Sequence, residues 1–150
     1  WCYVGGLSMG WMWTFDFVAR LPDYFASAFP ICVWGNPPWS NLLKRSPFWI
    51  FHGEDDGVVS VDFSRKMYEA LSKEKASVRL TIYPKVNHNS WDNSFAEPDL
   101  MHWLFSNKRW ELVSLPINKK LIKTLWVCLL FTEKDEFKKT NQKRNDYWPP

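Results

Sequence analysis

The feature that most constrains the fold of this chain is the G-x-S-x-G pattern of residues 6–10, centred on Ser8, which directly follows a short apolar stretch. Between a strand and a helix, this pattern forms a sharp turn that pushes the serine oxygen out above the sheet. Its two glycines lack a Cβ atom, so we expect backbone segments to pass close to each other there. Ser8 is therefore a candidate nucleophile. The backbone N–H of Met9, at the start of the helix, is a candidate donor to an oxyanion.

An acid and a base follow two later predicted strands. Residues 48–51 form an apolar run that leads into three acidic residues, Glu54, Asp55 and Asp56. Residues 78–83 alternate and are partly β-branched, which predicts another strand, and the chain then reaches His88. The order serine, acid, histidine is the order of the catalytic triad in the α/β-hydrolase fold.

These residue types support one chemistry together. Serine is a poor nucleophile until a neutral imidazole takes its proton, and a carboxylate fixes the imidazole tautomer and stabilises the imidazolium. Taken singly, each has a simpler explanation. Ser8 could lie in an ordinary turn, His88 could be a solvated loop residue, and the three acids could form a solvated loop. Their joint occurrence, each after a predicted strand, favours the triad.

The segment from His52 to Val59 indicates which carboxylate is the acid. It resembles the H-G-x-x-D-x-x-V stretch of many α/β hydrolases, and that resemblance assigns the acid to Asp56. Asp55 is the second candidate and Glu54 the third. We interpret His52, which precedes the turn glycine, as a structural histidine.

Four segments, residues 3–10, 29–32, 48–53 and 87–92, together resemble the esterase-like α/β hydrolases. This group is related to polyhydroxybutyrate depolymerases, feruloyl esterases and the catalytic domains of prolyl oligopeptidases, and includes proteins of the phospholipase/carboxylesterase type. The resemblance implies a three-layer α/β fold with a mostly parallel sheet flanked by helices. It also implies hydrolysis of carboxylic esters through an acyl-enzyme, without metal or organic cofactor. A serine peptidase of the prolyl oligopeptidase kind and a non-catalytic fragment remain alternatives.

The resemblance extends over residues 1–110, and the remaining residues 111–150 stay unassigned as a basic, partly disordered extension. Because the first residues already belong to a predicted strand, we expect residues 1–110 to be the C-terminal part of a hydrolase domain. The N-terminal strands and the loop with the second oxyanion donor would then be missing, and we expect weak activity from this chain alone. Localisation stays open.

Charge and aromatic content limit the partners. The net charge of +3 comes from residues 111–150, because residues 1–110 hold 11 Lys and Arg against 11 Asp and Glu. The neutral hydrolase part argues against nucleic acid. The apolar run 125–131 is too short to span a bilayer, so we expect a small-molecule or oligomeric ester as the partner. Among the 11 tryptophans, Trp34 and Trp91 are the candidates for substrate contact.

Three cysteines are too few for a disulfide scaffold, and we expect Cys2 and Cys32 to be buried thiols.

Strands alternating with helices predict a parallel sheet whose strand ends share one edge. The predicted elements are strands at 1–5, 29–33, 48–51 and 78–83 and helices at 9–21, 60–71 and 97–110, the second helix with Phe63, Met67, Tyr68 and Leu71 on its inner face.

Overall fold

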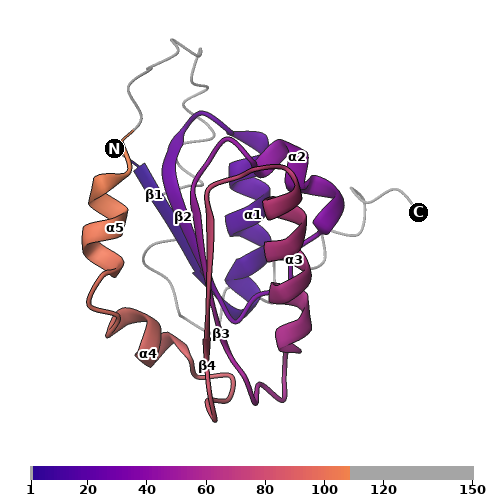
Figure 1. Cartoon of the computed structure of the whole chain (residues 1–150), viewed down its shortest axis with the longest axis vertical. Helices are drawn as coiled ribbons and strands as arrows, with labels where there is room; N and C mark the ends of the chain where they lie inside the picture. Colours follow the sequence, from indigo (N-terminus) through magenta and orange to yellow (C-terminus); the bar gives the residue numbers. More distant parts are fainter. Residues whose placement is uncertain (1, 109–150) are drawn as a thin grey trace, which may run out of the picture. The chain divides into compact units, whose positions relative to one another are not determined.

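The structure is a computed structural model that describes residues 2–108. Its sheet has four parallel strands in the order β1-β2-β3-β4, and helices cover both faces (Figure 1). Helices α1, α2 and α3 lie on one side of the sheet, and α4 and α5 lie on the other (Figure 1). The strands are β1 Cys2–Leu7, β2 Phe25–Ile31, β3 Phe48–Gly53 and β4 Val78–Tyr83; the helices are α1 Trp11–Arg20, α2 Ser40–Leu43, α3 Val61–Lys73, α4 Trp91–Phe95 and α5 Leu100–Ser106, with short 3₁₀ turns η1 Ser8–Gly10 and η2 Pro37–Trp39.

Strands β3 and β4 bring two loops together. Every residue of β3 is buried, as is usual for an apolar strand inside a parallel sheet. Its pairing with β4 runs without a shift from Phe48 opposite Val78 to Gly53 opposite Tyr83. Because the two strands end level, the loop after β3 and the loop after β4 start side by side. Both candidate residues of the acid–base pair lie in these loops.

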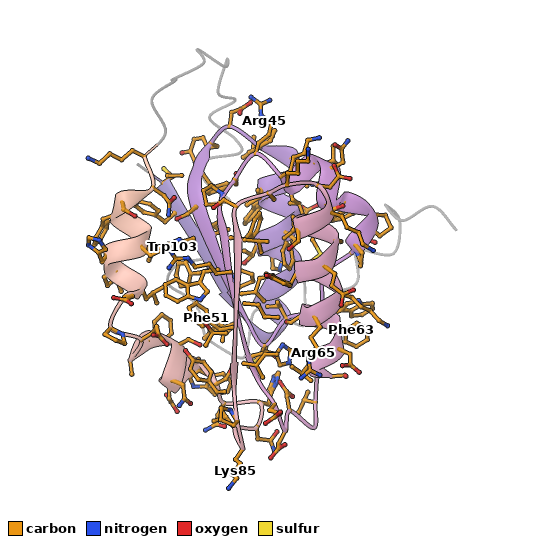
Figure 2. All side chains as sticks on the ribbon, viewed as in Figure 1. Arg45, Phe51, Phe63, Arg65, Lys85 and Trp103 are labelled. Carbon is orange, nitrogen blue, oxygen red and sulfur yellow. The ribbon has the colours of Figure 1, made fainter. Side chains whose placement is uncertain are left out.

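The core has an aromatic layer between the sheet and α5. Trp49 stacks on Phe51 with ring centroids 5.0 Å apart and meets Trp103 of α5 edge-on at 5.4 Å. Figure 2 shows Phe51 and Trp103 on facing elements of this layer. On the other face, Phe15 of α1 stacks on Phe48 at 5.5 Å. Burying side chains of this size stabilises the fold by about 1.5–3 kcal/mol each, so both faces of the sheet are anchored.

Strand β2 differs from its prediction at both ends. It begins at Phe25 rather than Phe29, because the small residues Ala26, Ser27 and Ala28 carry little strand propensity but are fully enclosed between the layers. It ends at Ile31 rather than Val33, because Cys32 adopts a left-handed backbone conformation with φ of 52°. A residue with this φ cannot continue an extended strand.

Helix α3 confirms its predicted start but not its whole inner face. The Ser60 side chain accepts a hydrogen bond from the Asp62 N–H at 3.3 Å and so caps the helix, which runs two residues beyond Leu71. Leu71 and Met67 are buried as predicted. Phe63 and Tyr68, by contrast, are 36% and 37% exposed, because they flank the buried stripe of positions 64, 67 and 71.

The predicted helix 97–110 is wrong at its start. Residues 91–95 form the separate short helix α4, and α5 begins only at Leu100. Pro98 explains the break, since a proline disfavours helical backbone in the residue before it. Helix α5 ends at Ser106, and the Asn107 side-chain amide donates to the Trp103 carbonyl at 2.7 Å. Leu100, Trp103 and Leu104 are buried, as their spacing indicates.

The remaining predictions concern Cys2, the helix that follows Ser8 and residues 111–150. Cys2 is exposed, contrary to its predicted burial, because it lies in the outermost described strand, which is largely half-exposed. The helix predicted at 9–21 begins as η1 and continues as α1 to Arg20. The interpretations made for residues 111–150 lie outside the described residues. Within residues 2–108, no helix is both long and apolar enough to cross a bilayer.

Candidate active site

Ser8 directly follows β1 and is the first residue of η1, where the backbone makes a strained turn. Its φ is +46°, in the left-handed region that non-glycine residues rarely adopt. Gly6 makes this turn possible, since a Cβ atom there would overlap with the Gly10 carbonyl oxygen and the Thr14 hydroxyl. Gly10 itself has open space around its would-be Cβ within the described residues, so the predicted need for glycine holds at Gly6 and not at Gly10. The Met9 N–H follows Ser8 in the same turn.

The structure brings Ser8, His88 and Asp56 into one hydrogen-bonded line. His88 Nε2 lies 2.7 Å from Ser8 Oγ, and His88 Nδ1 lies 2.8 Å from Asp56 Oδ2. Both distances are those of direct hydrogen bonds, and the order of the groups is the one that a base between a nucleophile and an orienting acid requires. The Asp56 side chain is fully buried, whereas Asp55 and Glu54 are exposed residues. Of the three acids after β3, Asp56 is therefore the one in contact with the imidazole.

Asp56 accepts hydrogen bonds on both of its oxygens. Oδ1 accepts from the N–H groups of Val58 at 2.9 Å and Val59 at 2.8 Å, and Oδ2 accepts from His88. Burial raises the pKa of this carboxyl group, but the hydrogen bonds from Val59, His88 and Val58 and the nearby imidazole outweigh burial, so the pKa of Asp56 lies below its usual value. The acid is therefore a carboxylate and can hold a proton on His88 Nδ1.

A second histidine touches the same carboxylate. His52 is fully buried, and its Nε2 lies 2.9 Å from the Val59 carbonyl oxygen and 3.2 Å from Asp56 Oδ2. Since both neighbours only accept hydrogen bonds, we assign the ring proton to Nε2, and Nδ1 then accepts from the Ser64 hydroxyl at 2.7 Å. Burial lowers the pKa of His52, opposed by the bond to Val59 and the Asp56 charge. The sequence indicated a structural histidine but gave no sign of its contact with Asp56.

The acid loop and the base loop are tied together by a residue that the sequence reasoning missed. Asn87 Oδ1 accepts from the Gly57 N–H at 3.0 Å and from the His88 N–H at 2.7 Å. The Asp55 N–H adds a bond to the Val86 carbonyl at 3.0 Å. A Cβ at Gly53 would overlap with the carbonyl oxygens of this base loop, which accounts for the glycine after His52. The available signal was an asparagine directly before the candidate base.

The two candidate substrate tryptophans have different surroundings. The Trp91 ring meets the His88 ring edge-on with centroids 6.0 Å apart, so it lies beside the candidate base. Trp34 is 50% exposed and contacts Phe63 of α3 at 5.4 Å. Figure 2 shows Phe63 on the outer surface of α3. The geometry therefore places Trp91 at the triad and Trp34 against α3.

Cys32 is buried as predicted, but the sequence gave no sign that it lies at the site. Its Sγ, a carboxylate oxygen of Asp56 and a ring nitrogen of His88 all lie within 4.8 Å of one another. Such a trio could ligate a metal ion, but the carboxylate and imidazole atoms are already engaged in hydrogen bonds. Burial also raises the pKa of the Cys32 thiol, and metals bind the thiolate. The donor set therefore fits a hydrogen-bonded site better than a metal centre.

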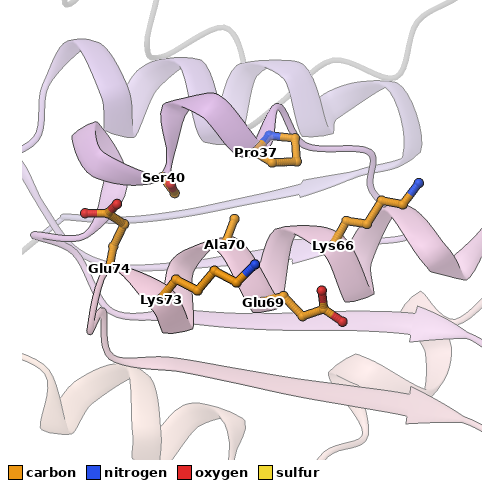
Figure 3. A pocket seen from close by; sticks show the side chains of 7 residues that line it. All are labelled: Pro37, Ser40, Lys66, Glu69, Ala70, Lys73 and Glu74. Atoms are coloured by element: carbon orange, nitrogen blue, oxygen red, sulfur yellow. The ribbon is translucent and has the colours of Figure 1, made fainter.

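The described residues also contain a hollow away from this site. It has a volume of about 360 Å³ and lies between η2, α2 and α3 (Figure 3). Its charged lining is of both signs, with Lys66 and Lys73 near Glu69 and Glu74. Since no triad residue lines it and its charges balance, we assign it no part in the chemistry.

A parallel sheet covered by helices on both faces, with a serine on a strained strand-to-helix turn, is the arrangement of the α/β-hydrolase fold. The chain has this fold, and the solved structures that it resembles include esterases and an acyl-protein thioesterase. A thermostable esterase of known structure is 36% identical, with a TM-score of 0.68 over 71% of this chain. The acyl-protein thioesterase 2 of Zea mays is 19% identical, with a TM-score of 0.54, and the chain covers 54% of it over 69% of its own length.

The acylaminoacyl peptidase of Pyrococcus horikoshii is 14% identical, with a TM-score of 0.61 over 73% of this chain and 24% of the peptidase. The chain spans 31% of the length of the thermostable esterase. No protein-family model matches the sequence, and no curated protein does.

Proposed function

We propose that this chain carries the catalytic residues of a serine hydrolase that cleaves carboxylic esters through an acyl-enzyme. One observation carries the proposal: His88 contacts Ser8 Oγ at 2.7 Å through one ring nitrogen and Asp56 at 2.8 Å through the other. That arrangement lets the imidazole take a proton from the serine while the carboxylate fixes its tautomer. The lowered pKa of Asp56 supports the same assignment, because the acid has to stay ionised.

In the proposed reaction, Ser8 Oγ attacks the ester carbonyl carbon as its proton passes to His88 Nε2. The Met9 N–H donates to the oxygen that becomes negative in the tetrahedral intermediate. Protonated His88 then donates to the leaving alcohol, and Ser8 keeps the acyl group. A water molecule, deprotonated by His88, attacks the acyl-enzyme and releases the acid. Asp56 stabilises the imidazolium in both halves of the reaction.

An ester is favoured over an amide as the substrate. Over the aligned part, this chain is 36% identical to the thermostable esterase, whereas it is 14% identical to the peptidase of Pyrococcus horikoshii, which indicates a common fold alone. We propose a small-molecule or oligomeric ester whose acyl or alcohol part lies near Trp91, with Trp34 as an outer contact. A prolyl oligopeptidase-like peptidase is the second candidate, because it uses the same triad.

Labelling with a fluorophosphonate tests the nucleophile. We expect the probe to modify Ser8 in the printed chain and in any longer protein that contains it, as located by peptide mass spectrometry. Ser8→Ala should abolish labelling, while Ser60→Ala, at an exposed serine, should label like the wild type. Modification of Ser60 or Ser90 with Ser8 left free would contradict the assignment. Rates with p-nitrophenyl acetate and an acyl p-nitroanilide then separate the ester and amide alternatives.

A further inference from the structure

Cys32 occupies a backbone conformation that its side chain does not favour. It directly follows β2, and its φ of 52° lies in the left-handed region where glycine is the usual residue. The residue is nevertheless fully buried, and its thiol reaches a loop 56 positions further along the chain. A strained non-glycine residue beside a reactive group points to a role for its side chain.

The thiol is part of a chain of hydrogen bonds whose direction can be assigned. Cys32 Sγ lies 3.3 Å from the His88 carbonyl oxygen and 2.8 Å from Ser90 Oγ. A carbonyl oxygen only accepts, and a thiol has one proton, so the S–H donates to His88 and the Ser90 hydroxyl donates to the sulfur. Ser90 is buried, and its own carbonyl oxygen accepts from the Ser94 hydroxyl at 2.7 Å. The thiol is thus held between α4 and the backbone of the candidate base.

We propose that Cys32, supported by Ser90, is a positioning residue that fixes the main chain of His88 so that the imidazole reaches Ser8 and Asp56 together. The proposal rests on the proposed function. The main chain of His88 is then held at both of its polar groups. Asn87 Oδ1 accepts a hydrogen bond from the His88 N–H at 2.7 Å, and the Cys32 thiol donates to the His88 carbonyl oxygen. Cys32 touches no reacting atom in this scheme.

The protonated thiol suits this role. Burial raises the pKa of Cys32, and the bonds from Ser90 only partly oppose that effect. The group therefore stays a neutral donor. A thiolate would lack the proton that it gives to the His88 carbonyl and would face that oxygen as a second acceptor.

Three substitutions separate the thiol from the backbone strain. Cys32→Ser keeps a donor, Cys32→Ala removes it and keeps the strain, and Cys32→Gly removes it and relieves the strain. We expect Ala and Gly to lower the rate of Ser8 labelling about tenfold, as for one lost hydrogen bond, and Ser to restore most of it. Cys32→Gly should melt no lower than Cys32→Ala. Cys2→Ser, at an exposed cysteine, is the matched control.

A second readout is independent of Ser8 chemistry. The His88 Nδ1–H proton, bound to Asp56, should give a downfield proton NMR signal that is absent in His88→Gln. We expect the signal to persist in Cys32→Ser and to broaden or vanish in Cys32→Ala, Cys32→Gly and, to a smaller degree, Ser90→Ala. If Cys32→Ala does not fold, Cys32→Ser and Ser90→Ala still test the positioning role of the thiol.

The two readouts distinguish the two proposals. If Cys32→Gly were labelled at the wild-type rate and its His88 signal were unchanged, the positioning role of the thiol would be overturned. An unlabelled wild-type chain whose His88 signal still follows the presence of a donor at position 32 would support positioning and contradict the proposed function. A folded Cys32→Ser variant that behaves like Cys32→Ala would also overturn the role, because it retains a donor.

Discussion

The acid–base side of the site and the nucleophile side are built differently. The acid and base follow β3 and β4, and β3 is buried along its whole length. Their loops are joined by main-chain bonds, for example from the Glu54 N–H to the Tyr83 carbonyl at 2.9 Å, and by the side chain of Asn87. Ser8 follows β1, whose described residues are exposed or half-buried, and it meets the other two loops through its bond to His88.

This difference indicates that Asp56 and His88 form one pre-organised unit, to which a separate strand presents the candidate nucleophile Ser8. The geometry of the pair depends on hydrogen bonds across neighbouring loops. The position of Ser8 depends instead on the pairing of Leu7 with Ile31 and on one strained turn. Because rates fall steeply when reacting groups are misplaced by an ångström, changes on the two sides should give different signatures. Four substitutions test this, from the largest expected effect to the smallest.

Asp56→Asn should break the acid–base unit while the fold is retained. The asparagine oxygen can still accept from Val58 and Val59, but its amide would donate toward His88 Nδ1 and force the wrong tautomer. We expect kcat for p-nitrophenyl acetate to fall by about 10⁴-fold, with little change in melting temperature. Asp55→Asn, at the exposed neighbour, should leave kcat unchanged. Equal losses in the two variants would contradict the choice of Asp56.

Gly6→Ala should damage the nucleophile side alone. The added methyl group would overlap with the Gly10 carbonyl oxygen and the Thr14 hydroxyl, so β1 or the turn has to shift. We expect fluorophosphonate labelling of Ser8 to be lost and the free energy of unfolding to fall by about 1–3 kcal/mol. The downfield proton signal of the Asp56–His88 pair should remain.

Gly10→Ala is the matched control for this experiment, because nothing described lies within 4 Å of its would-be Cβ. Its labelling rate and stability should stay near those of the wild type. Loss of the His88 signal in Gly6→Ala would show that the acid–base unit is not independent of the elbow.

Asn87→Ala should loosen the acid–base unit without removing a triad residue. Two N–H groups, those of Gly57 and His88, would lose their acceptor. The contacts are partly solvent-exposed, so water can replace them, and we expect kcat/KM to fall by about tenfold. Asn89→Ala, at an exposed asparagine two positions on, should have little effect. An unchanged kcat/KM in Asn87→Ala would show that the backbone bonds between the loops suffice.

The sequence predicts much of the site because its parts have local signatures. Ser8 lies in a turn pattern, and Asp56 and His88 each follow a strand that is recognisable from its own residues. The strand β4 was predicted to the residue, since its alternation is unambiguous. The carboxyl ends of parallel strands share one edge, so the convergence of the three residues follows from topology alone.

The supporting residues could not be predicted in the same way. Cys32, Asn87 and the contact of His52 with Asp56 depend on distances between loops, which no local pattern encodes. The early start of β2 was missed because its Ala-Ser-Ala segment gains stability from enclosure rather than from strand propensity. Phe63 was placed in the core because hydrophobic spacing on a helix does not distinguish the centre of a stripe from its margin.

Of the four substitutions, His52→Gln should have the smallest effect. It tests how the free energy of unfolding depends on pH through the buried histidine beside Asp56. Burial keeps the pKa of His52 below the usual histidine value of about 6.5. On acidification the unfolded chain therefore takes up this proton first, and the free energy of unfolding falls as the pH drops below that value. The contribution from Asp56 has the same sign, because its folded pKa is also depressed. It begins only below about pH 4, near the usual pKa of an aspartate in an unfolded chain.

Denaturant unfolding at pH 7 and pH 5 can isolate the histidine term. We expect the wild type to lose stability between these values through His52, by at most about 2 kcal/mol, since each pH unit below the unfolded pKa of about 6.5 contributes at most about 1.4 kcal/mol. His52→Gln should show a flatter dependence, because it has no proton to gain. His102→Gln, at an exposed histidine of α5, is the matched control substitution. If His52→Gln kept the wild-type dependence, the buried histidine beside Asp56 would not be the group that weakens the acid–base side in acid.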